Sequence, residues 1–381
     1  MKILNKIIEI LFNKKFSFRR LKKKPVLIYD KLSLRELNDL IPSKKIEVLD
    51  NREEINLLII LKMLINLKFG KNYYYKFYLN TVSPNLIITT SDHDIFFYKI
   101  KEIYPYAKTA IIQLSYRHDK FGDLFSILKN KKIKKKYKID YIFCFGADFA
   151  KEYKKYINGK AITVGSVRNN KLIKFKKKKK TISFISQFRN RSKTNEDYIF
   201  HRWKNKKLMH SEFFSLEKKL IPLIADFCKK KNYKLRIIGC ARNKESEEKK
   251  FYKMLINDLK WTYLSKEPGT KSTYKWLNES SINIFTESTL GFESLARGIK
   301  TISFYARKSL NHNAYFGWPS KKKARGYFWT NEITASEVKR LMTNIISINN
   351  KKWLDLKEKT TSSIITLDED NKILKNFLNK F

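Results

Sequence analysis

Residues 281–306 read SINIFTESTLGFESLARGIKTISFYA, and they are the best starting point for predicting the fold. The first five residues are mostly apolar and short in extent, a pattern typical of a buried strand. Residues 290–296 place apolar side chains at helical spacing, and Gly298 follows as a usual helix stop. Residues 301–306 have the pattern of a second strand. A strand, a tight turn, a short helix and another strand predict a parallel α/β sheet.

The turn inside this stretch has the side chains of a phosphate site. Ser288 and Thr289 fall where the helix begins, and that positive helix end favours a phosphate. Gly291 would let a ligand come close to the backbone. Glu293 could accept two hydrogen bonds from a vicinal diol such as ribose. Ser-Thr before a helix is more often only a cap, but Glu287 on the other side of the turn and the late position in the chain favour a nucleotide site.

The alternation of strand and helix continues through the whole chain. Strand patterns occur at 26–30, 85–90, 109–114, 141–146, 161–166, 181–186, 234–240 and 260–266. Helical patterns occur at 55–69, 94–104, 147–157, 212–232, 272–280, 335–347 and about 368–380, and residues 188–203 have the pattern of a loop. This βαβ series predicts parallel sheets.

A lysine-rich stretch divides the series into two. Residues 168–180, RNNKLIKFKKKKK, carry a run of like charge that is normally solvated. Residues 171–180 are therefore expected to link a domain at 1–170 to a domain at 181–381. The predicted fold class is α/β, with two Rossmann-like domains that face a central cleft, and the residues at the strand ends are the site candidates.

Composition narrows the class of protein. The chain has 381 residues and a net charge of +46. A lysine-rich chain of this kind is what an AT-biased genome encodes, but an enzyme at an anionic lipid surface or a nucleic-acid binder would also gain from the charge. The lysines are spread along the chain without a zinc-finger, RNP or helix-turn-helix signature, so no specific nucleic acid is expected.

The N-terminus and the cysteines point to a reducing compartment. Residues 1–20 have an amphipathic pattern without a cleavage site, so they predict a helix on a membrane surface or packed on the fold rather than a signal peptide. Apolar runs are too short for a membrane-spanning helix. Cys144, Cys228 and Cys240 are scattered in apolar contexts and read as buried thiols rather than as disulfides or zinc ligands.

Several ordered stretches resemble one family of proteins. They are ESTLGFESLARGIKTISFY at 287–305, PNLIITTSDHDIFFYKIKEIYPYAKTAIIQ at 84–113, DYIFCFGADFAKEYKKYINGKAITVGSVRNN at 140–170, ISFISQFR at 182–189 and FGWPSKKKARGYFWT at 316–330. The set is similar to GT-B glycosyltransferases and, more narrowly, to bacterial surface carbohydrate biosynthesis proteins, from about residue 50 to 340. The resemblance implies an acceptor-side N-terminal domain, a nucleotide-sugar-binding C-terminal domain and a last helix that crosses back to the first domain.

On the donor side, the resemblance implies that Ser288, Thr289 and Gly291 hold the phosphate and that Glu293 holds the ribose. Gln187 and Arg189 follow the strand at 181–186. Arg189 could stabilise the charge of the leaving nucleotide, or could be a solvated loop residue. Glu267 and Thr270, after the strand at 260–266, could approach the base or ribose.

On the acceptor side, the sequence TSDHD closes the strand at 85–90. Asp92 and His93 are the candidates for a general base that deprotonates an acceptor hydroxyl, while Asp94 more simply caps the next helix. The D-H-D triplet also matches the metal-binding D-x-D of the GT-A fold, but the late phosphate turn argues against that fold. The expected acceptor wall consists of Gln113, Ser115, Arg117 and His118, and Gly165 and Ser166 are expected near a phosphate at the hinge.

These residues predict a glycosyltransferase that moves a sugar from a nucleotide-sugar to a surface polysaccharide or a lipid-linked glycan acceptor. No metal and no cofactor are expected, because basic residues and helix amides can neutralise the leaving phosphate. Alternatives on the same fold are a sugar-nucleotide epimerase and a polyol-phosphate transferase. A basic nucleic-acid- or membrane-binding protein is the alternative of another class. The expected location is the cytoplasm, with peripheral contact at the inner face of the plasma membrane. Aromatic residues such as Trp329 could stack on sugars, but they more often fill the core.

Overall fold

The computed structural model describes residues 15–50, 53–117, 124–130, 137–171, 179–189, 197–203, 206–240, 245–256, 259–265, 272–305 and 324–381. Most of the expected N-terminal amphipathic helix and of the lysine-rich linker lies outside these ranges. His118, Glu267, Thr270 and the Gly-Trp-Pro triplet at 317–319 also lie outside them.

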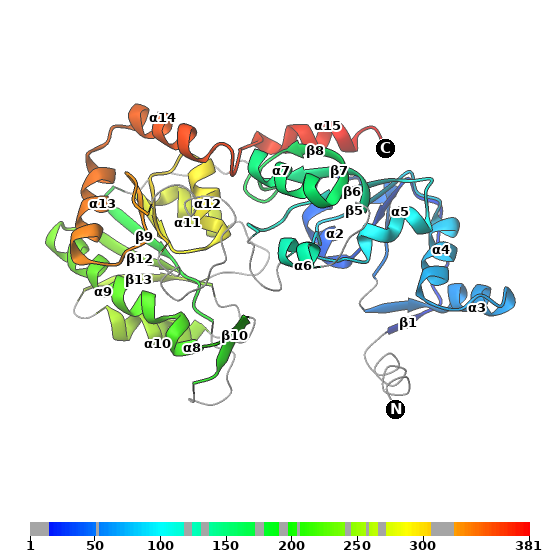
Figure 1. Cartoon of the computed structure of the whole chain (residues 1–381), viewed down its shortest axis with the longest axis horizontal. Helices are drawn as coiled ribbons and strands as arrows, with labels where there is room; N and C mark the ends of the chain where they lie inside the picture. Colours follow the sequence, from blue (N-terminus) through cyan, green and yellow to red (C-terminus); the bar gives the residue numbers. More distant parts are fainter. Residues whose placement is uncertain are drawn as a thin grey trace.

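Two six-stranded parallel sheets organise the chain. The first has the order β3 (Ile46–Val48), β2 (Val26–Ile28), β5 (Leu86–Thr89), β6 (Lys108–Ile112), β7 (Tyr137–Cys144), β8 (Ile157–Thr163). The second has the order β13 (Trp261–Leu264), β12 (Lys234–Ile238), β9 (Thr181–Ile185), β14 (Ile282–Phe285), β15 (Thr301–Phe304), β16 (Trp329–Thr330). We call the parts built on these sheets the N-terminal half and the C-terminal half; Figure 1 shows them side by side.

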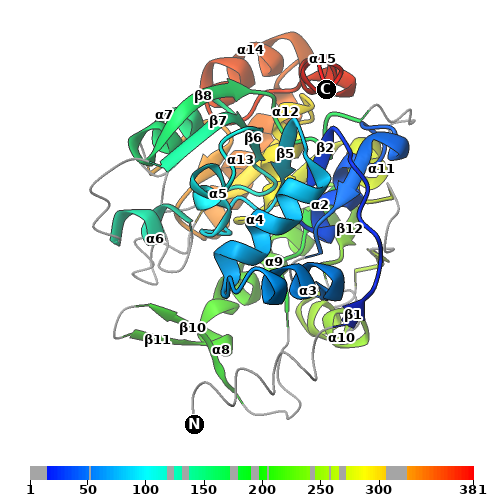
Figure 2. The same cartoon turned by 90° about the vertical axis from the view of Figure 1, so that its right-hand side faces the viewer.

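Helices cover the sheets on both faces. Those of the N-terminal half are α2 (Lys31–Leu37), α3 (Leu57–Ile65), α4 (Lys71–Val82), α5 (Ile100–Ile103), α6 (Leu124–Asn130) and α7 (Ala147–Tyr156). Those that follow in the chain are α8 (His210–Phe213), α9 (Ser215–Lys230), α10 (Glu245–Leu255), α11 (Ser272–Glu279), α12 (Thr289–Ala296), α13 (Ala335–Ser347), α14 (Asn350–Thr361) and α15 (Lys372–Leu378). Figure 2 shows the N-terminal half end-on, with α2, α3 and α4 toward the viewer.

The cores follow from the alternation of side chains along each strand. In β2, Leu27 belongs to one buried cluster, while Val26 and Ile28 belong to another on the opposite face. Both faces of the strand are therefore apolar, as expected of a central parallel strand. The second cluster is completed by Leu37 of α2 and by Leu374 of α15.

The last two helices pack on different halves of the molecule. In α14, the indole Nε1 of Trp353 donates a hydrogen bond of 2.9 Å to the carbonyl of Gly298 in the C-terminal half. In α15, the ring of Phe377 lies 4.7 Å from Tyr141 and 4.9 Å from Phe143 of β7, measured between ring centroids. The chain thus crosses back to the N-terminal half between these helices, as the family resemblance implied and as Figure 1 shows.

The returning segment is held beside the end of β8. Gly165 has a φ of +69° and forms an isolated bridge with Leu367. A Cβ at this position would lie 2.2 Å from the carbonyl oxygen of Thr366, so glycine is required for the close approach of the two backbones.

The start of the expected linker stretch is a buried junction. Asn169 and Asn170 are buried rather than solvated, so the reading of these two residues as part of a solvated charge run was wrong. Asn170 Nδ2 donates to Asn371 Oδ1 at 2.9 Å, and the backbone N–H of Asp368 donates to Asn170 Oδ1 at 3.2 Å. These two contacts bind the outgoing chain to the returning chain.

Some elements differ from the pattern in the sequence. The expected helix at 94–104 is a 3₁₀ turn, Phe97–Lys99, followed by the short α5. The loop expected at 188–203 ends in β10 (Ile199–Trp203), which pairs antiparallel with β11 (Lys206–Met209). The apolar run at 55–69 begins with β4 (Glu54–Asn56), which pairs with β1 (Lys15–Ser17), and its helix ends at Ile65. Five of the helices, α2, α4, α6, α10 and α14, were not expected from the sequence.

Within the described ranges, no helix combines the length and the apolar character that crossing a bilayer requires. The three cysteines are free thiols; Cys144 and Cys228 are buried, and Cys240 is half-buried. Burial raises the pKa of the Cys144 thiol well above its usual value and that of Cys228 to about 12.

Candidate functional site

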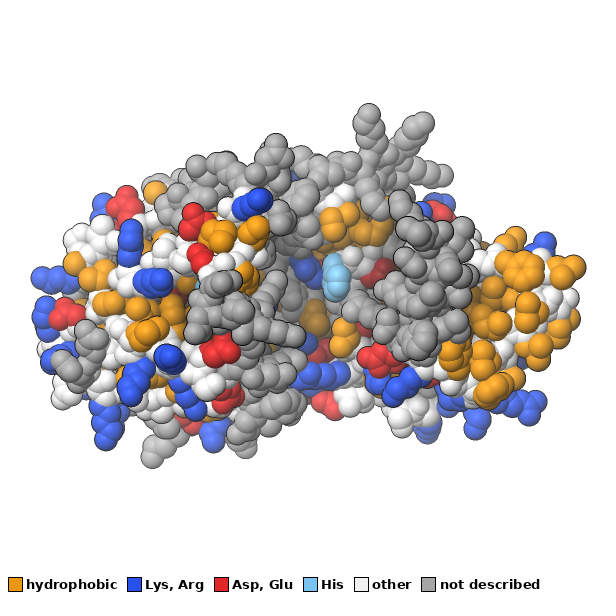
Figure 3. Space-filling model, turned by 90° about the horizontal axis from the view of Figure 1, so that it is seen from below, with side chains coloured by type: hydrophobic (Ala, Val, Ile, Leu, Met, Phe, Trp, Pro, Cys, Tyr) orange, Lys and Arg blue, Asp and Glu red, His pale blue; other side chains and the backbone are white. Residues whose placement is uncertain are grey.

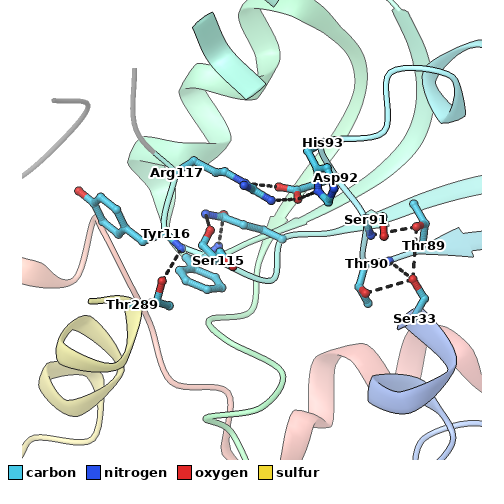
Figure 4. A network of polar contacts seen from close by, with 12 residues as sticks. Ser33, Thr89, Thr90, Ser91, Asp92, His93, Ser115, Tyr116, Arg117 and Thr289 are labelled. Carbon is cyan, nitrogen blue, oxygen red and sulfur yellow. Dashed lines mark hydrogen bonds and ion pairs between the residues drawn. The ribbon is translucent and has the colours of Figure 1, made fainter. Parts of the chain in front are cut away.

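The carboxyl ends of the two sheets meet through the loop after β6 and the start of α12. The backbone N–H of Tyr116 donates to Thr289 Oγ1 at 3.1 Å. The Tyr116 ring stacks on Phe292, with 3.9 Å between centroids and 6° between planes. The contact joins residues far apart in sequence and places the predicted phosphate turn directly against the N-terminal half (Figure 4).

The turn after β14 is held by its own polar groups. Ser288 is the N-cap of α12, and its hydroxyl accepts from the N–H of Leu290 at 3.3 Å. Gln187 Oε1 accepts from the hydroxyl of Thr286 at 2.9 Å and from the N–H of Glu287 at 3.1 Å. Gln187 thus fixes the turn from the end of β9, and the predicted donor-side residues are brought together.

Gly291 has a packing reason as well as the predicted one. It is buried in the first turn of α12, and a Cβ there would lie 2.0 Å from the ring of Phe285. Any larger residue would push α12 away from β14. The close approach that the structure shows is therefore between helix and strand.

Glu293 is buried between the halves. Its carboxylate accepts hydrogen bonds from the hydroxyl of Ser166 and from that of Tyr274, the latter at 3.1 Å. Asn169 Nδ2 donates to the Glu293 backbone carbonyl at 3.0 Å. Burial raises the pKa of the Glu293 carboxyl above its usual value, while the hydrogen bonds and the charge of Arg168 act in the opposite direction. The carboxylate that was predicted to bind ribose thus also ties the two halves together.

Asp92 and His93, the two predicted bases, have opposite surroundings. Asp92 is fully buried, and its carboxylate forms an ion pair with Arg117, including a hydrogen bond of 2.9 Å from Nε to Oδ2. Tyr153 donates a further hydrogen bond of 2.6 Å to the same carboxylate. The His93 side chain is 52% exposed, with Nδ1 4.0 Å from Asp92 Oδ1. Only His93 of the two is open to a ligand (Figure 4).

The loop of the predicted acceptor wall is positioned by Gln113. Its side chain is buried, with Nε2 donating to the Ser115 carbonyl at 3.0 Å and Oε1 accepting from the Phe145 N–H at 2.9 Å. Both ends of the amide are thus used within the protein. Ser115 is half-buried beyond it, and Arg117 is turned toward Asp92.

The remaining predicted residues lie at the margins of this region. Arg189 is exposed after β9, and its carbonyl accepts from Tyr198 at 3.3 Å. Asp94 Oδ1 accepts from the Phe96 N–H at 2.9 Å, but the N-cap of the following 3₁₀ turn is Phe96, so the expected helix cap at Asp94 is wrong. Gly165 faces the returning chain, as described above. Trp329 is half-buried in the C-terminal half.

The sequence did not single out a buried hydroxyl cluster beside Asp92. Asp30 Oδ2 accepts from Thr89 Oγ1 at 2.7 Å and from Ser33 Oγ at 2.8 Å, and Ser33 Oγ lies 3.0 Å from Thr90 Oγ1. Figure 4 shows how these hydroxyls fix the end of β5. Two features of the sequence could have indicated this cluster. Asp30 follows the strand at 26–28, and Thr89 and Thr90 lie at the end of the strand at 86–89. By fixing the end of β5, the cluster fixes the position of the backbone from which Asp92 and His93 follow.

The two halves border a hollow in the surface. Figure 3 shows it between them, with a histidine and both acidic and basic side chains inside. In the part of the chain that the structure describes, no three His, Cys, Asp or Glu side chains gather in a way that could hold a metal ion.

Two parallel α/β halves whose strand ends face each other across a hollow have the GT-B fold. Three solved structures are similar over nearly their whole length. The wall teichoic acid polymerase TagF has a TM-score of 0.51 at 11% identity, covering 100% of this chain and 96% of that chain. UDP-GlcNAc 2-epimerase from Neisseria meningitidis has a TM-score of 0.51 at 9% identity, covering 95% and 100%. The "putative UDP-N-acetylglucosamine 2-epimerase" from Listeria monocytogenes has a TM-score of 0.53 at 9% identity, covering 95% of this chain and 98% of that chain.

The sequence itself belongs to a family. The model of the family described as "putative O-antigen biosynthesis protein" matches residues 110–381, so the chain is a member of that O-antigen biosynthesis family. No curated protein sequence matches the chain. The family and the solved structures confirm both the predicted fold class and the predicted relationship to proteins of surface carbohydrate biosynthesis.

Proposed function

We propose that this protein is a glycosyltransferase that moves a sugar from a nucleotide-sugar to a surface polysaccharide or lipid-linked glycan. The observation that carries the proposal is the contact between the predicted phosphate turn at 286–289 and the loop that follows β6. This contact supports the proposal because the next residue of the same loop, Arg117, pairs with Asp92, the neighbour of His93 in the chain. Membership of an O-antigen biosynthesis family supports the same reaction class.

In this reaction His93 would take the proton from an acceptor hydroxyl. The hydroxyl oxygen would then form a bond to the anomeric carbon of the donor, and the bond from that carbon to the donor phosphate would break. The leaving phosphate would meet the amide end of α12 at Ser288 and Thr289. Arg189, exposed after β9, is the proposed source of positive charge for it. Asp92 and Arg117 would position His93 rather than react.

The structure sharpens the role proposed for Glu293. Its carboxylate already accepts from Ser166 and Tyr274, so a ribose diol would have to join or replace these donors. Donor binding would then act directly on the contact between the halves.

The test is a thermal-shift panel of CMP, UDP, UMP, GDP and ADP at high salt, on wild type, Glu293→Gln and Tyr274→Phe. One nucleotide should raise the melting temperature by roughly 5 °C at about 100 times its dissociation constant. Glu293→Gln should abolish that shift, while Tyr274→Phe, which removes only a neighbour's hydrogen bond to the same carboxylate, should retain it. Equal shifts in the melting temperatures of wild type and Glu293→Gln, or no shift in either, would contradict nucleotide binding at the turn and would leave Ser288 as a helix cap only.

A sugar-nucleotide epimerase is the second candidate, because two of the similar folds carry that name. Proton NMR of UDP-GlcNAc incubated with the protein separates the reactions. An epimerase changes the configuration of the sugar without an acceptor, whereas a transferase leaves it unchanged until an acceptor is present. A polyol-phosphate transferase would also need an acceptor, but would transfer its phosphate as well.

The location also remains part of the proposal. A lipid-linked acceptor would bring the enzyme to the inner face of the plasma membrane as a peripheral protein, and neither a cofactor nor a specific nucleic acid is proposed.

A further inference from the structure

Helix α3 carries far more apolar side chains than the fold buries. Eight of its nine residues are apolar, but only Ile59 and Met63 are buried, against the rest of the N-terminal half. Ile65 is 73% exposed, and Leu61 and Leu64 are each about half exposed. A helix that is apolar all round is normally enclosed. Here one whole side of it faces outward.

The apolar surface extends beyond the helix. Leu67 and Phe69, in the turn between α3 and α4, are 78% and 61% exposed. On the other side, β1 pairs with β4 directly before α3, which brings Phe16 and the 74% exposed Phe18 to the start of the helix. Figure 3 shows apolar side chains gathered at the right-hand end of the molecule, the end that carries α3 in Figure 1.

Basic side chains are interleaved with this surface. Lys62 lies within α3, and Lys68 stands between the two exposed apolar residues of the turn. Lys15 and Arg20 flank the exposed phenylalanines of β1. The acidic groups nearby are partly engaged: Glu54 lies 4.0 Å from Arg19, and Glu53 bonds Lys31 at 3.2 Å.

We infer that this surface, Phe16, Phe18, Leu61, Leu64, Ile65, Leu67 and Phe69 with their neighbouring lysines, docks on an anionic lipid bilayer. The apolar side chains would enter the interfacial region while the lysines meet lipid phosphates, which is the pattern of an interfacial helix. Helix α3, which carries most of the surface, lies at one end of the molecule (Figure 1). Complementary charge favours a lipid surface over a second copy of so basic a chain, because two copies would repel each other.

This inference goes beyond the proposed function, since it rests on α3 and its neighbours and uses neither the turn at 286–289 nor His93. It would hold for any chemistry in the hollow. The vesicle assay below also needs no nucleotide, so it can fail while the nucleotide panel succeeds, or the reverse.

The test is co-sedimentation of the full chain with phosphatidylcholine vesicles containing either no or about 30% phosphatidylglycerol, at about 0.15 M salt. Wild type should bind the anionic vesicles. A triple variant Leu64→Gln, Ile65→Gln, Leu67→Gln should bind at least about tenfold more weakly. The matched control replaces three exposed apolar residues elsewhere, Met254→Gln, Leu354→Gln and Ile373→Gln, and should bind like wild type.

A charge variant tests the second half of the inference. Lys62→Gln with Lys68→Gln should weaken binding by roughly fivefold per lysine, and added salt should reduce the difference. Equal binding by wild type and the α3 triple variant would overturn the inference, as would equal losses in the triple variant and its control. A wild-type dimer in light scattering that the triple variant abolishes would assign the surface to a second copy instead.

Discussion

Asp92 and His93 are neighbours in the chain, yet their surroundings give them different tasks. The Asp92 carboxylate has no exposed surface and is held by Arg117 and Tyr153. The side chain of His93 is 52% exposed. A general base must reach the proton that it removes, and a buried carboxylate in an ion pair does not. The arrangement is therefore consistent with the proposal that His93 reacts and that Asp92 positions it.

Substitution should separate these two tasks. Asp92→Asn breaks a buried ion pair and should lower the free energy of unfolding by about 3 kcal/mol in urea titrations. His93→Gln should leave that free energy within about 0.5 kcal/mol of wild type and should lower nucleotide release from the donor by about 100-fold. A stable but inactive Asp92→Asn, together with an active His93→Gln, would reverse the assignment.

The sequence could identify polar residues at strand ends but not their partners. Asp92, Gln113 and Glu293 were all found as candidates because they follow strands or begin helices. Their ties come from other segments: Tyr153 lies 61 residues beyond Asp92, and Ser166 lies 127 residues before Glu293. Local spacing does not show which distant segments will cover a residue. The sequence therefore could not distinguish a candidate that is exposed, such as His93, from one that is buried, such as Asp92.

At the scale of elements, the start of α13 is fixed by an acid with two arginine partners. Glu337 accepts from Arg340 Nη2 at 2.7 Å and Nε at 3.0 Å, and Arg325 also pairs with it. These contacts, with the Arg340 hydrogen bond foremost, lower the pKa of the Glu337 carboxyl to about 2. The folded protein thus releases this proton more readily than the unfolded chain.

Stability should therefore depend on Glu337 at acidic pH. Its contribution is complete above the usual pKa of 4.5 and is lost as the pH falls from there toward about 2. Glu337→Gln should cost roughly 2 kcal/mol at neutral pH and should flatten the acid limb of the stability curve. Glu358→Gln, which removes a 64% exposed carboxylate on α14, should change neither. Parallel acid limbs for wild type and Glu337→Gln would contradict the argument.

Periodicity predicted the central strands but missed several helices, among them α4, which buries Tyr75, Tyr78, Leu79 and Val82. The central strands were found because both faces of each are apolar. Helix α14 was missed because its only buried residues are Trp353 and Thr361, which leaves no apolar stripe to recognise. The helix expected at 94–104 has the right spacing, but the segment first turns in a 3₁₀ conformation. The spacing of apolar residues does not distinguish a 3₁₀ turn from an α-helix over so short a segment.

At the scale of the molecule, α15 belongs to the half that the chain left some 200 residues earlier. Phe377→Ala removes a buried ring that packs on Tyr141 and Phe143, so it should lower the free energy of unfolding by about 3 kcal/mol. Hydrogen exchange should accelerate in β7 rather than in β14 or β15. The control, Ile373→Ala, changes a 45% exposed residue of the same helix and should have little effect. Faster exchange confined to the C-terminal half would refute this packing.

The order of the two halves was predictable from the sequence, whereas the return of α15 came only from the family resemblance. The residues of α15 show an apolar side, and such a side can pack on either sheet. What decides the choice is the junction, where Asn170 meets Asn371 and Gly165 meets Leu367. No spacing rule connects residues so far apart.

The junction also limits how the molecule can move. The polypeptide passes from one half to the other twice, near residue 170 and again before residue 371, and the two passages are bonded side by side. Two domains joined by one segment can rotate in many directions, whereas two adjacent connecting segments form a hinge that restricts the rotation. The halves should therefore open and close about one axis through this point. Because Tyr116 and Thr289 come from different halves and already contact each other, a ligand that binds both would hold the two halves together.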